Sequence, residues 1–515
     1  MGRFWTLRLP RPMSRRLALA VLVWLLTQGH AITTGDSGLD RGDQQALRRY
    51  ARDTWHSFEA MAQAGALPAD GLRRDEDGTW RPTEQTTPTD IGAYLWSTLA
   101  AERLGIIEPA EARRRLEQTL AALAGVERPH GLFLDKLDRR SGARLRAWPG
   151  NGEVIHPLLS AADNGWLATA LIMIGNTRPE LRQRADALLK PMDFGFFYDA
   201  YDPADPIKHP GHLHGAFQIE TQSFGYLHQL INTEARIAGY IGIARGQIPP
   251  EHYYRVYRTL PPDRRWQGQI PEGTWRTYRG IRVFEGHYTY RGLRIVPSWG
   301  GSMFEALMVT LFVPEARWAP RSWGVNHRLY VRAQIEHGLD VRRYGVWGFS
   351  PACRPEGGYR DYGVDALGTN PEGYHTHEQQ GGGPQHRGGQ PGGAQEPPSG
   401  PLPAGVVTPH ASFLALPFAP RAAMANLHAL EARFPAIYTS YGFRDSVNVS
   451  TGRISDCVLA LDQGMILAAI ANALADEFMQ HAFSDGPVEQ SIRPLIAPEE
   501  FTAGPADDTE CERSP

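Results

Sequence analysis

The stretch from Pro297 to Asp361 decides the fold and reads PSWGGSMFEALMVTLFVPEARWAPRSWGVNHRLYVRAQIEHGLDVRRYGVWGFSPACRPEGGYRD. A Gly-Gly turn opens an apolar run over Met303–Phe312, which predicts a helix that carries one acid, Glu305. A second helical pattern over Asn326–His337 follows a loop rich in Pro and Trp. Helices that alternate with aromatic loops are typical of an all-helical barrel that lines a carbohydrate groove, because aromatic faces stack on sugar rings.

The same helical unit recurs on both sides of this stretch. Apolar residues at helical spacing, with Pro and capping residues at the starts, predict pairs of antiparallel helices. The predicted helices are 40–65, Thr89–Leu104, 109–123, Asp163–Met173, Pro179–Leu189, Thr221–Ile243, Pro250–Leu260, Thr408–Phe418, Pro420–Phe434, Asp462–Phe478 and Pro487–Leu495.

Strand-like alternation is confined to Thr277–Arg282 and Tyr288–Val296, which predicts short β-hairpins in loops. About six helical hairpins therefore favour an all-α fold, either an (α/α)6 toroid or an open solenoid. We expect one domain over residues 40–500. The Gly-, Gln- and Pro-rich segment 376–404 is expected to be a disordered insertion, and 503–515 a disordered tail.

Composition excludes several classes of function. A net charge of −3 gives no electrostatic case for nucleic acid, which calls for a basic face. No phosphate loop and no Gly-x-Ser-x-Gly motif occurs, so nucleotide chemistry and the usual esterase signal have no support. The histidines of segment 209–214 lack a carboxylate pattern, and we expect no metal and no cofactor. Of the three cysteines, Cys353 and Cys457 either form one bridge or stay unpaired.

The N-terminus predicts export. Arg15 and Arg16 precede the apolar run LALAVLVWLL, and Gly29, His30 and Ala31 offer a cleavage site for a signal peptide over residues 1–31. The mature protein would then be secreted, periplasmic or part of the cell envelope, with no membrane span. A retained membrane anchor is the alternative, although the run is short for one.

Three segments of the central stretch, WGGSMFEAL, WGVNH and WGFSP, resemble the glycoamylase-like domain family. This family includes bacterial endo-β-1,2-glucanases and a hydrolase-like domain of cyclic β-1,2-glucan synthases. Further segments with the same resemblance are TPTDIG (87–92), SAADNGWL (160–167), NTE (232–234), YGFRDSVN (441–448) and LDQGM (461–465). The family's histidine-rich THYS segment after the Gly-Gly turn is here FEALMV, so the floor of the groove differs.

The resemblance implies a closed (α/α)6 ring and a glycoside hydrolase that acts on a polysaccharide or oligosaccharide, with a β-1,2-linked glucan as the best guess. Such hydrolysis needs two carboxyl groups across the scissile bond, one of which protonates the leaving oxygen. Glu234 begins an apolar helix and matches a glutamate of the glucanases that resembles a general acid. Asp163 and Asp462 each open a helix, and either a helix cap or a general base explains them. The predicted catalytic residues are Glu234, Asp163 and Asp462.

Glu305 lies inside an apolar helix, where a carboxylate is costly unless it is paired or lies at a cleft. A buried pair with Arg321 or His327 is the alternative to a site role. Other acids, amides and aromatic residues beside Gly and Pro loops are expected to bind sugar. The predicted substrate-binding residues are Glu305, Trp299, Trp323, Asn326, His327, Trp347, Tyr359, Asp361, Phe443, Asp445 and Gln463.

Two rival functions remain open at this level. A non-catalytic glycan-binding or envelope-assembly protein would keep the barrel and lose the geometry of its acids. A transglycosylase would use similar residues and shield the intermediate from water. The placement of the carboxylates separates the first rival from a hydrolase, and the size of the products separates the second.

Overall fold

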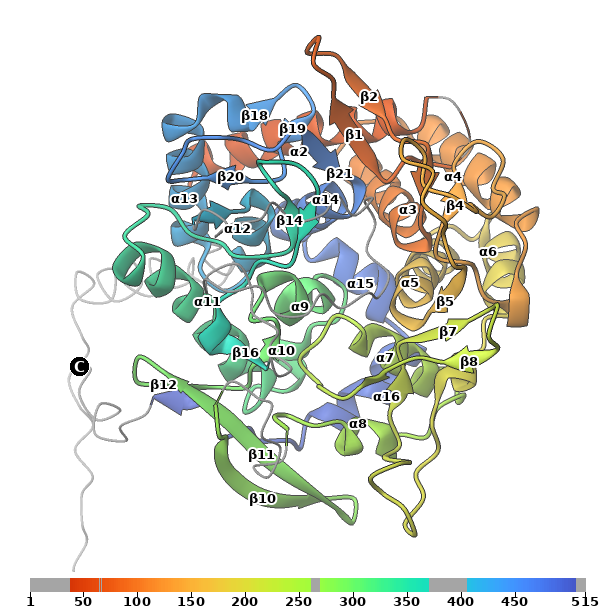
Figure 1. Cartoon of the computed structure of the whole chain (residues 1–515), viewed down its shortest axis with the longest axis vertical. Coiled ribbons are helices and arrows are strands. Elements are labelled where there is room, and N and C mark those ends of the chain that lie inside the picture. The colour runs from red at the N-terminus through yellow and green to blue at the C-terminus, as the bar shows by residue number, and fades with distance from the viewer. Residues whose placement is uncertain (1–37, 64, 66, 261–268, 370–404, 506–515) are drawn as a thin grey trace, which may run out of the picture. The chain divides into compact units, whose positions relative to one another are not determined.

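The computed structural model describes residues 38–63, 65, 67–260, 269–369 and 405–505, and the chain from Asp40 onward forms one compact unit (Figure 1). The predicted signal peptide (1–31), the predicted insertion (376–404) and residues 506–515 of the predicted tail lie outside the described residues.

One set of helices is buried on nearly every side. It consists of α3 (Pro88–Arg103), α5 (Ala161–Thr177), α7 (Arg236–Ala244), α9 (Met303–Leu307), α12 (Pro409–Ala415) and α14 (Ala460–Leu474). Neighbours in this set pack directly, as α3 with α5, α5 with α7, α9 with α12, α12 with α14, and α14 with α3. Small residues permit the close approach: a side chain at Gly464 would collide with Ala93 and Trp96 of α3.

A second set of helices buries only one face each. Helix α2 (Arg41–Met61), for example, buries Leu47, Tyr50, Phe58 and Met61 and exposes its charged side. This pattern is the one expected of helices that cover a buried set. The other members are α4 (Pro109–Ala124), α6 (Arg182–Leu189), α8 (Glu251–Arg255), α10 (Glu315–Trp318), α11 (Trp323–Glu336), α13 (Pro420–Arg433), α15 (Phe478–Ser484) and α16 (Pro487–Ile496).

Strands are short and lie in the connections. The longest form an antiparallel sheet in the order β10 (Glu272–Tyr278), β11 (Ile281–Tyr290), β12 (Leu293–Ile295), β22 (Gly504–Pro505). The predicted hairpins are therefore longer than expected, and residues 504–505 pair in a sheet, which corrects the start of the predicted tail at 503. The remaining strands are β1 (Gly71–Arg74), β2 (Trp80–Pro82), β3 (Gln85–Thr86), β4 (Leu137–Asp138), β5 (Leu158–Ser160), β6 (Leu213–His214), β7 (Ala216–Gln218), β8 (Ser223–Phe224), β9 (Leu227–His228), β13 (Ser298–Trp299), β14 (Ala352–Cys353), β15 (Tyr359–Arg360), β16 (Gly368–Thr369), β17 (Val406–Val407), β18 (Tyr438–Thr439), β19 (Gly442–Phe443), β20 (Val447–Asn448) and β21 (Cys457–Leu459).

The mainly helical fold and most predicted helices are confirmed within one turn at their ends. The helix predicted over Thr221–Ile243 is wrong in its first half, because 221–235 contains β8, β9 and a turn, and the helix begins at Arg236. The helix predicted over Met303–Phe312 ends at Leu307 and continues as a 3-10 turn over Met308–Leu311. Within the described ranges, the helices fall short of the length and apolarity needed to cross a membrane.

Candidate active site

Polar side chains lie at the N-terminal ends of all the buried helices. Four helices carry acids in their first turn: α3 has Asp90 next to Thr89, α5 has Asp163, α9 has Glu305 and α14 has Asp462. Glu234 lies in the turn before α7, and His410 lies at the start of α12. The positive end of a helix dipole favours carboxylates at these positions. The fold therefore brings acids that are distant in sequence to one end of the buried helices.

Glu234 and Glu305 meet directly. The backbone N–H of Glu234 donates to Oε2 of Glu305 over 2.9 Å, and the hydroxyl of Thr233 donates to the same oxygen over 2.6 Å. The predicted alternative for Glu305, a pair with Arg321 or His327, is not what the structure has: His327 contacts Glu315 instead. Glu305 is only partly exposed, yet its carboxylate forms no ion pair with a cationic side chain of the described residues, because Arg236 and His327 pair with Glu315.

The two glutamates differ in their surroundings. Burial and then the charge of Glu305 raise the pKa of Glu234 well above its ordinary value, and the one side-chain donor that opposes this is the indole N–H of Trp166. Burial also raises the pKa of Glu305, to about 7, although the hydrogen bonds from Thr233 and from the N–H of Glu234 favour its ionised form. Of the two glutamates, Glu234 is thus the one that keeps its proton to the higher pH.

Asp163 also lies near Glu234. The helix cap of α5 is Ser160, which excludes the cap alternative for Asp163; Asp163 instead accepts a hydrogen bond from Thr89 over 2.6 Å. Its charge contributes to raising the pKa of Glu234. Asp163 is partly exposed and therefore available to a ligand.

A buried ion pair that sequence reasoning missed supports Asp163. Lys136 Nζ lies 3.0 Å from Asp135 Oδ2, and both side chains are buried. Burial lowers the pKa of Lys136, but the charges of Asp135, Asp163 and Asp90 outweigh it and raise that pKa. The sequence did contain one signal for this pair: Lys136 is one of few lysines in a chain whose basic residues are almost all arginine.

The Gly-Gly turn places the next acid. The backbone of Gly301 lies against Val364, whose N–H donates to Gly301 over 3.0 Å, and a Cβ at Gly301 would overlap the Val364 carbonyl. This contact holds the loop of Asp361 close enough for its charge to raise the pKa of Glu305. Tyr359, on β15, is partly exposed; burial and then the charges of Asp462, Asp361, Asp445 and Glu305 raise its pKa well above the ordinary value. Tyr359 and Asp361 therefore lie among the predicted acids.

A second group comprises His410, Asp445 and Asp462, all of them buried. Burial raises the pKa of Asp462 to about 6, and burial together with the charge of Asp462 raises that of Asp445. Cys353 and Cys457 form a disulfide beside this group, which settles the alternative left open for them. The backbone N–H of Cys353 donates to Asp445 Oδ2.

Tyr226 is a further residue that sequence reasoning missed. It precedes β9, and 63% of its surface is exposed. Partial desolvation, followed by the charges of Glu234, Glu305 and Asp163, raises the pKa of its hydroxyl. An exposed ring beside three carboxylates is suited to stacking on a sugar. A short run of strands replaces the helix predicted here, so the expected periodicity hid this position.

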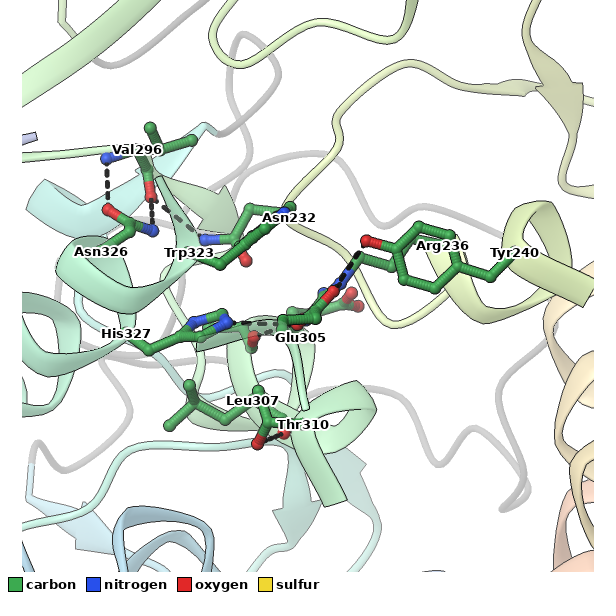
Figure 2. Close-up of polar contacts among 12 residues, drawn as sticks. Asn232, Arg236, Tyr240, Val296, Glu305, Leu307, Thr310, Trp323, Asn326 and His327 are labelled. Atoms are coloured by element: carbon green, nitrogen blue, oxygen red, sulfur yellow. Dashed lines mark hydrogen bonds and ion pairs between the residues drawn. The ribbon is translucent and has the colours of Figure 1, made fainter. Parts of the chain in front are cut away.

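Several predicted sugar contacts are buried and have internal partners, which corrects that prediction. Figure 2 shows Asn326 bound to the backbone of Val296, with bonds of 2.8 and 3.2 Å. Trp323 donates to the hydroxyl of Tyr253 over 2.9 Å and stacks on His327. The residues with this placement are Trp323, Asn326, His327, Trp347, Phe443 and Gln463.

The contacts of Glu315 explain why His327 is structural. Arg236, from α7, forms a bidentate pair with Glu315 at 2.8 and 2.9 Å, and Tyr240 and His327 complete the contacts of that carboxylate. Arg236 also donates to the carbonyl of Ala306 over 3.0 Å. This network joins α7 to α9 and thereby fixes Glu234 against Glu305. Trp299, on β13, is partly exposed and remains available.

Comparison with family models supports the resemblance read from the sequence. Residues 267–487 match a family described as "Putative glucoamylase", and residues 49–195 match "Protein of unknown function (DUF3131)". The curated cyclic beta-(1,2)-glucan synthase NdvB of Rhizobium meliloti is 27% identical over 625 residues. That match covers 93% of this chain but 19% of the synthase, so the chain spans about a fifth of that relative's length.

Solved structures share the fold. A putative glucoamylase from Bacteroides caccae has a TM-score of 0.61 at 15% identity, with 88% of this chain and 99% of that one covered. An endo-beta-1,2-glucanase from Chitinophaga pinensis, solved with sophorotriose and glucose, has a TM-score of 0.60 at 15% identity. The match covers 88% of this chain and 98% of the glucanase. An endo-beta-1,2-glucanase from Talaromyces funiculosus has a TM-score of 0.57 at 11% identity, and the match covers 90% of this chain and 94% of that glucanase. The resemblance to the glycoamylase-like domain family is confirmed.

Proposed function

We propose that this chain, whose residues 267–487 match the family described as "Putative glucoamylase", is a glycoside hydrolase that cleaves a glucan. The observation that carries the proposal is the meeting of Glu234, Glu305 and Asp163 at one end of the buried helices. Acids that were separated in sequence by 71 residues or more share one electrostatic environment. Glu234 and Glu305 both have raised pKa values, and such shifts are typical of catalytic sites.

Glu234 is assigned as the general acid. A group that protonates a leaving oxygen must hold its proton near neutral pH, and burial beside a second carboxylate produces that property. Glu234 has this environment, whereas Glu305 receives two hydrogen bonds that favour its charged form. The indole N–H of Trp166 orients the Glu234 carboxyl.

Glu305 and Asp163 are the two carboxylates available as the partner. Glu305 is bonded to the backbone of Glu234, and Asp163 is held by Thr89 with Lys136 nearby. Either one would act on the sugar carbon directly or through a water. Asp462, also predicted to be catalytic, belongs to the buried second group and is assigned a supporting role. Tyr359, Asp361, Trp299 and Tyr226 are assigned to substrate binding.

A β-1,2-linked glucan is proposed as the substrate. The support is the naming of two fold relatives as endo-beta-1,2-glucanases and of the curated relative as a cyclic beta-(1,2)-glucan synthase. A closed (α/α)6 ring is proposed for the buried helices. Its support is their direct packing as successive neighbours, with the Arg236 network joining α7 to α9.

Export to the periplasm, the cell envelope or the medium is also proposed. The support is the N-terminal pattern together with a disulfide between two buried cysteines, since disulfides persist in oxidising compartments. Transglycosylation is the second candidate function, and the curated synthase favours it.

The test is incubation of the full chain with linear β-1,2-, β-1,3-, β-1,4- and α-1,4-glucans, followed by sizing of the products. Shorter oligosaccharides from the β-1,2-glucan alone would support hydrolysis. Products that are longer than the substrate or cyclic would instead support transglycosylation. A lack of new products from every glucan would contradict both.

A further inference from the structure

We propose that His410, Asp445 and Asp462 form a binding site for one divalent transition-metal ion, of the class of Zn²⁺ or Mn²⁺. The three side chains come from α12, from the turn after β19 and from α14. Their ligand atoms all lie within 4.8 Å of one another. This site goes beyond the proposed hydrolysis, and its test does not depend on activity.

Unsatisfied polar atoms point to a missing partner at this place. Within the described residues, neither ring nitrogen of His410 makes a hydrogen bond, and Oδ1 of Asp445 and Oδ2 of Asp462 have no donor except a proton that the two carboxyl groups would share. The three residues are 1%, 2% and 4% exposed, so bulk water does not satisfy these atoms. Buried polar atoms without partners are rare because each costs free energy. One metal ion would be a partner for one ring nitrogen of His410 and for one oxygen of each aspartate.

The spacing of the atoms fits coordination better than hydrogen bonding. His410 Nδ1 and Asp462 Oδ2 are 3.3 Å apart without the geometry of a hydrogen bond. Two ligands bound to the same ion at about 2.0–2.2 Å, at the angles of a tetrahedral or octahedral site, lie roughly 3.0–3.5 Å apart. The observed separation therefore matches one edge of a coordination polyhedron.

Charge and ligand type indicate which ion fits. Neither Asp445 nor Asp462 has an ion pair with an arginine or lysine in the part of the chain that the structure describes. Two carboxylates and a neutral imidazole carry a charge of −2, which a divalent cation balances. An imidazole beside carboxylates favours a transition metal over Ca²⁺ or Mg²⁺, which prefer oxygen ligands alone.

The surrounding contacts leave the free atoms available. The N–H of Cys353 occupies Oδ2 of Asp445 and leaves Oδ1 for the ion. The side-chain amide of Gln463 donates a hydrogen bond to the carbonyl of Phe443 over 2.9 Å. This bond fixes the turn that carries Asp445. Such bonds to the outer side of a ligand are typical of metal sites. An ion here would join α12, α14 and the Asp445 turn beside Tyr359.

The experiment uses the full chain without a histidine tag, stripped with a chelator and then titrated with Zn²⁺ and with Mn²⁺ by calorimetry. We expect one equivalent to bind and the Tm to rise with the bound ion. His410→Ala and Asp462→Asn should each weaken binding at least about 100-fold, the upper part of the range for loss of a metal contact. The control is His481→Ala, which removes an exposed histidine paired with Asp485 and should bind as the wild type does.

The wild-type titration decides the matter even where a variant fails to fold. Stripped wild type that binds no equivalent of either ion would overturn the proposal, and the two carboxylates would then share a proton. Equal binding by folded His410→Ala and by wild type would also overturn it. One-to-one loading with Co²⁺ that gives absorption bands in wild type and none in His410→Ala would support the site through its nitrogen ligand.

Discussion

The backbone N–H of Glu234 donates a hydrogen bond to Oε2 of Glu305 over 2.9 Å, and the hydroxyl of Thr233 donates to the same oxygen. The turn that presents the proposed general acid therefore also stabilises the charge of its neighbour. Two carboxyl groups of the same type are driven toward different protonation states, as acid and base catalysis requires.

Removal of the Thr233 hydroxyl should shift the pH dependence of the reaction. If Glu305 is the carboxylate that acts on the sugar carbon or on its water, it does so only when ionised, so kcat/KM should fall as the pH drops below its pKa of about 7. Thr233→Val removes a donor that favours the ionised form, and the acidic limb should move upward by about one pH unit. The measurement is kcat/KM from pH 5 to 9, with the exposed Thr451→Val as control. A limb that stays in place, or moves down, would contradict the role of Glu305.

The Arg236–Glu315 pair should account for much of the stability between α7 and α10. Both groups are buried, and Glu315→Gln leaves the Arg236 charge without its carboxylate, at a cost of about 3–5 kcal/mol. Burial alone would raise the pKa of Glu315, but Arg236 and His327 lower it to about 2. The stability from this ionised group is therefore full above about pH 4.5 and is lost as the pH falls toward 2. Urea unfolding of wild type and variant at several pH values measures both effects, and identical curves would refute them.

Glu285 should have the opposite dependence on pH. It is fully buried on β11, and burial raises its pKa to about 8, although Arg258 lies 3.7 Å away. The folded protein then holds a proton that the unfolded chain releases near pH 4.5, so stability should decrease as the pH rises from about 4.5 to about 8. Glu285→Gln should flatten this decrease, whereas Glu272→Gln, at an exposed position on the neighbouring strand, should keep it. Thermal unfolding from pH 5 to 9 tests this, and an unchanged slope in Glu285→Gln would exclude the assignment.

The disulfide should stabilise the loops that carry Tyr359 and Asp445. It closes a separation of 104 residues. The double variant Cys353→Ser/Cys457→Ser should lose about 2–5 kcal/mol of stability. Reductant should lower the Tm of wild type toward that of the variant and leave the variant unchanged. A Tm of wild type that is insensitive to complete reduction would argue against this contribution.

Helix positions could be predicted from the sequence because the periodic segments are long and bounded by Pro and capping residues. The prediction failed over 221–235 because β8 pairs with β7 and β9 pairs with β6, and this tertiary pairing overrode the local helix propensity. Glu305 was found because a carboxylate inside an apolar helix is costly without a partner, and Glu234 was found because its segment resembles one of the glucanases. Their meeting at one end, however, depends on contacts between helices that no local pattern contains.

The aromatic residues were the weakest part of the prediction. A tryptophan beside a glycine or proline loop has the same local signature whether it faces a ligand or the core. Trp323 and Trp347 turned out to be buried, whereas Tyr226, in a segment predicted to be helical, is exposed beside three acids. Burial of a side chain depends on which neighbouring element covers it, and the sequence alone does not specify that.

The most direct measurement compares wild type and Glu234→Gln on linear β-1,2-glucan, with product sizing and with Glu489→Gln, a partly exposed glutamate on α16, as control. A general acid contributes about 10²–10⁴-fold, so Glu234→Gln should lose turnover by at least about 100-fold while its Tm and circular dichroism stay close to those of wild type. Glu489→Gln should release short oligosaccharides at the wild-type rate. Wild-type turnover by a folded Glu234→Gln would contradict the assignment of Glu234 as the acid.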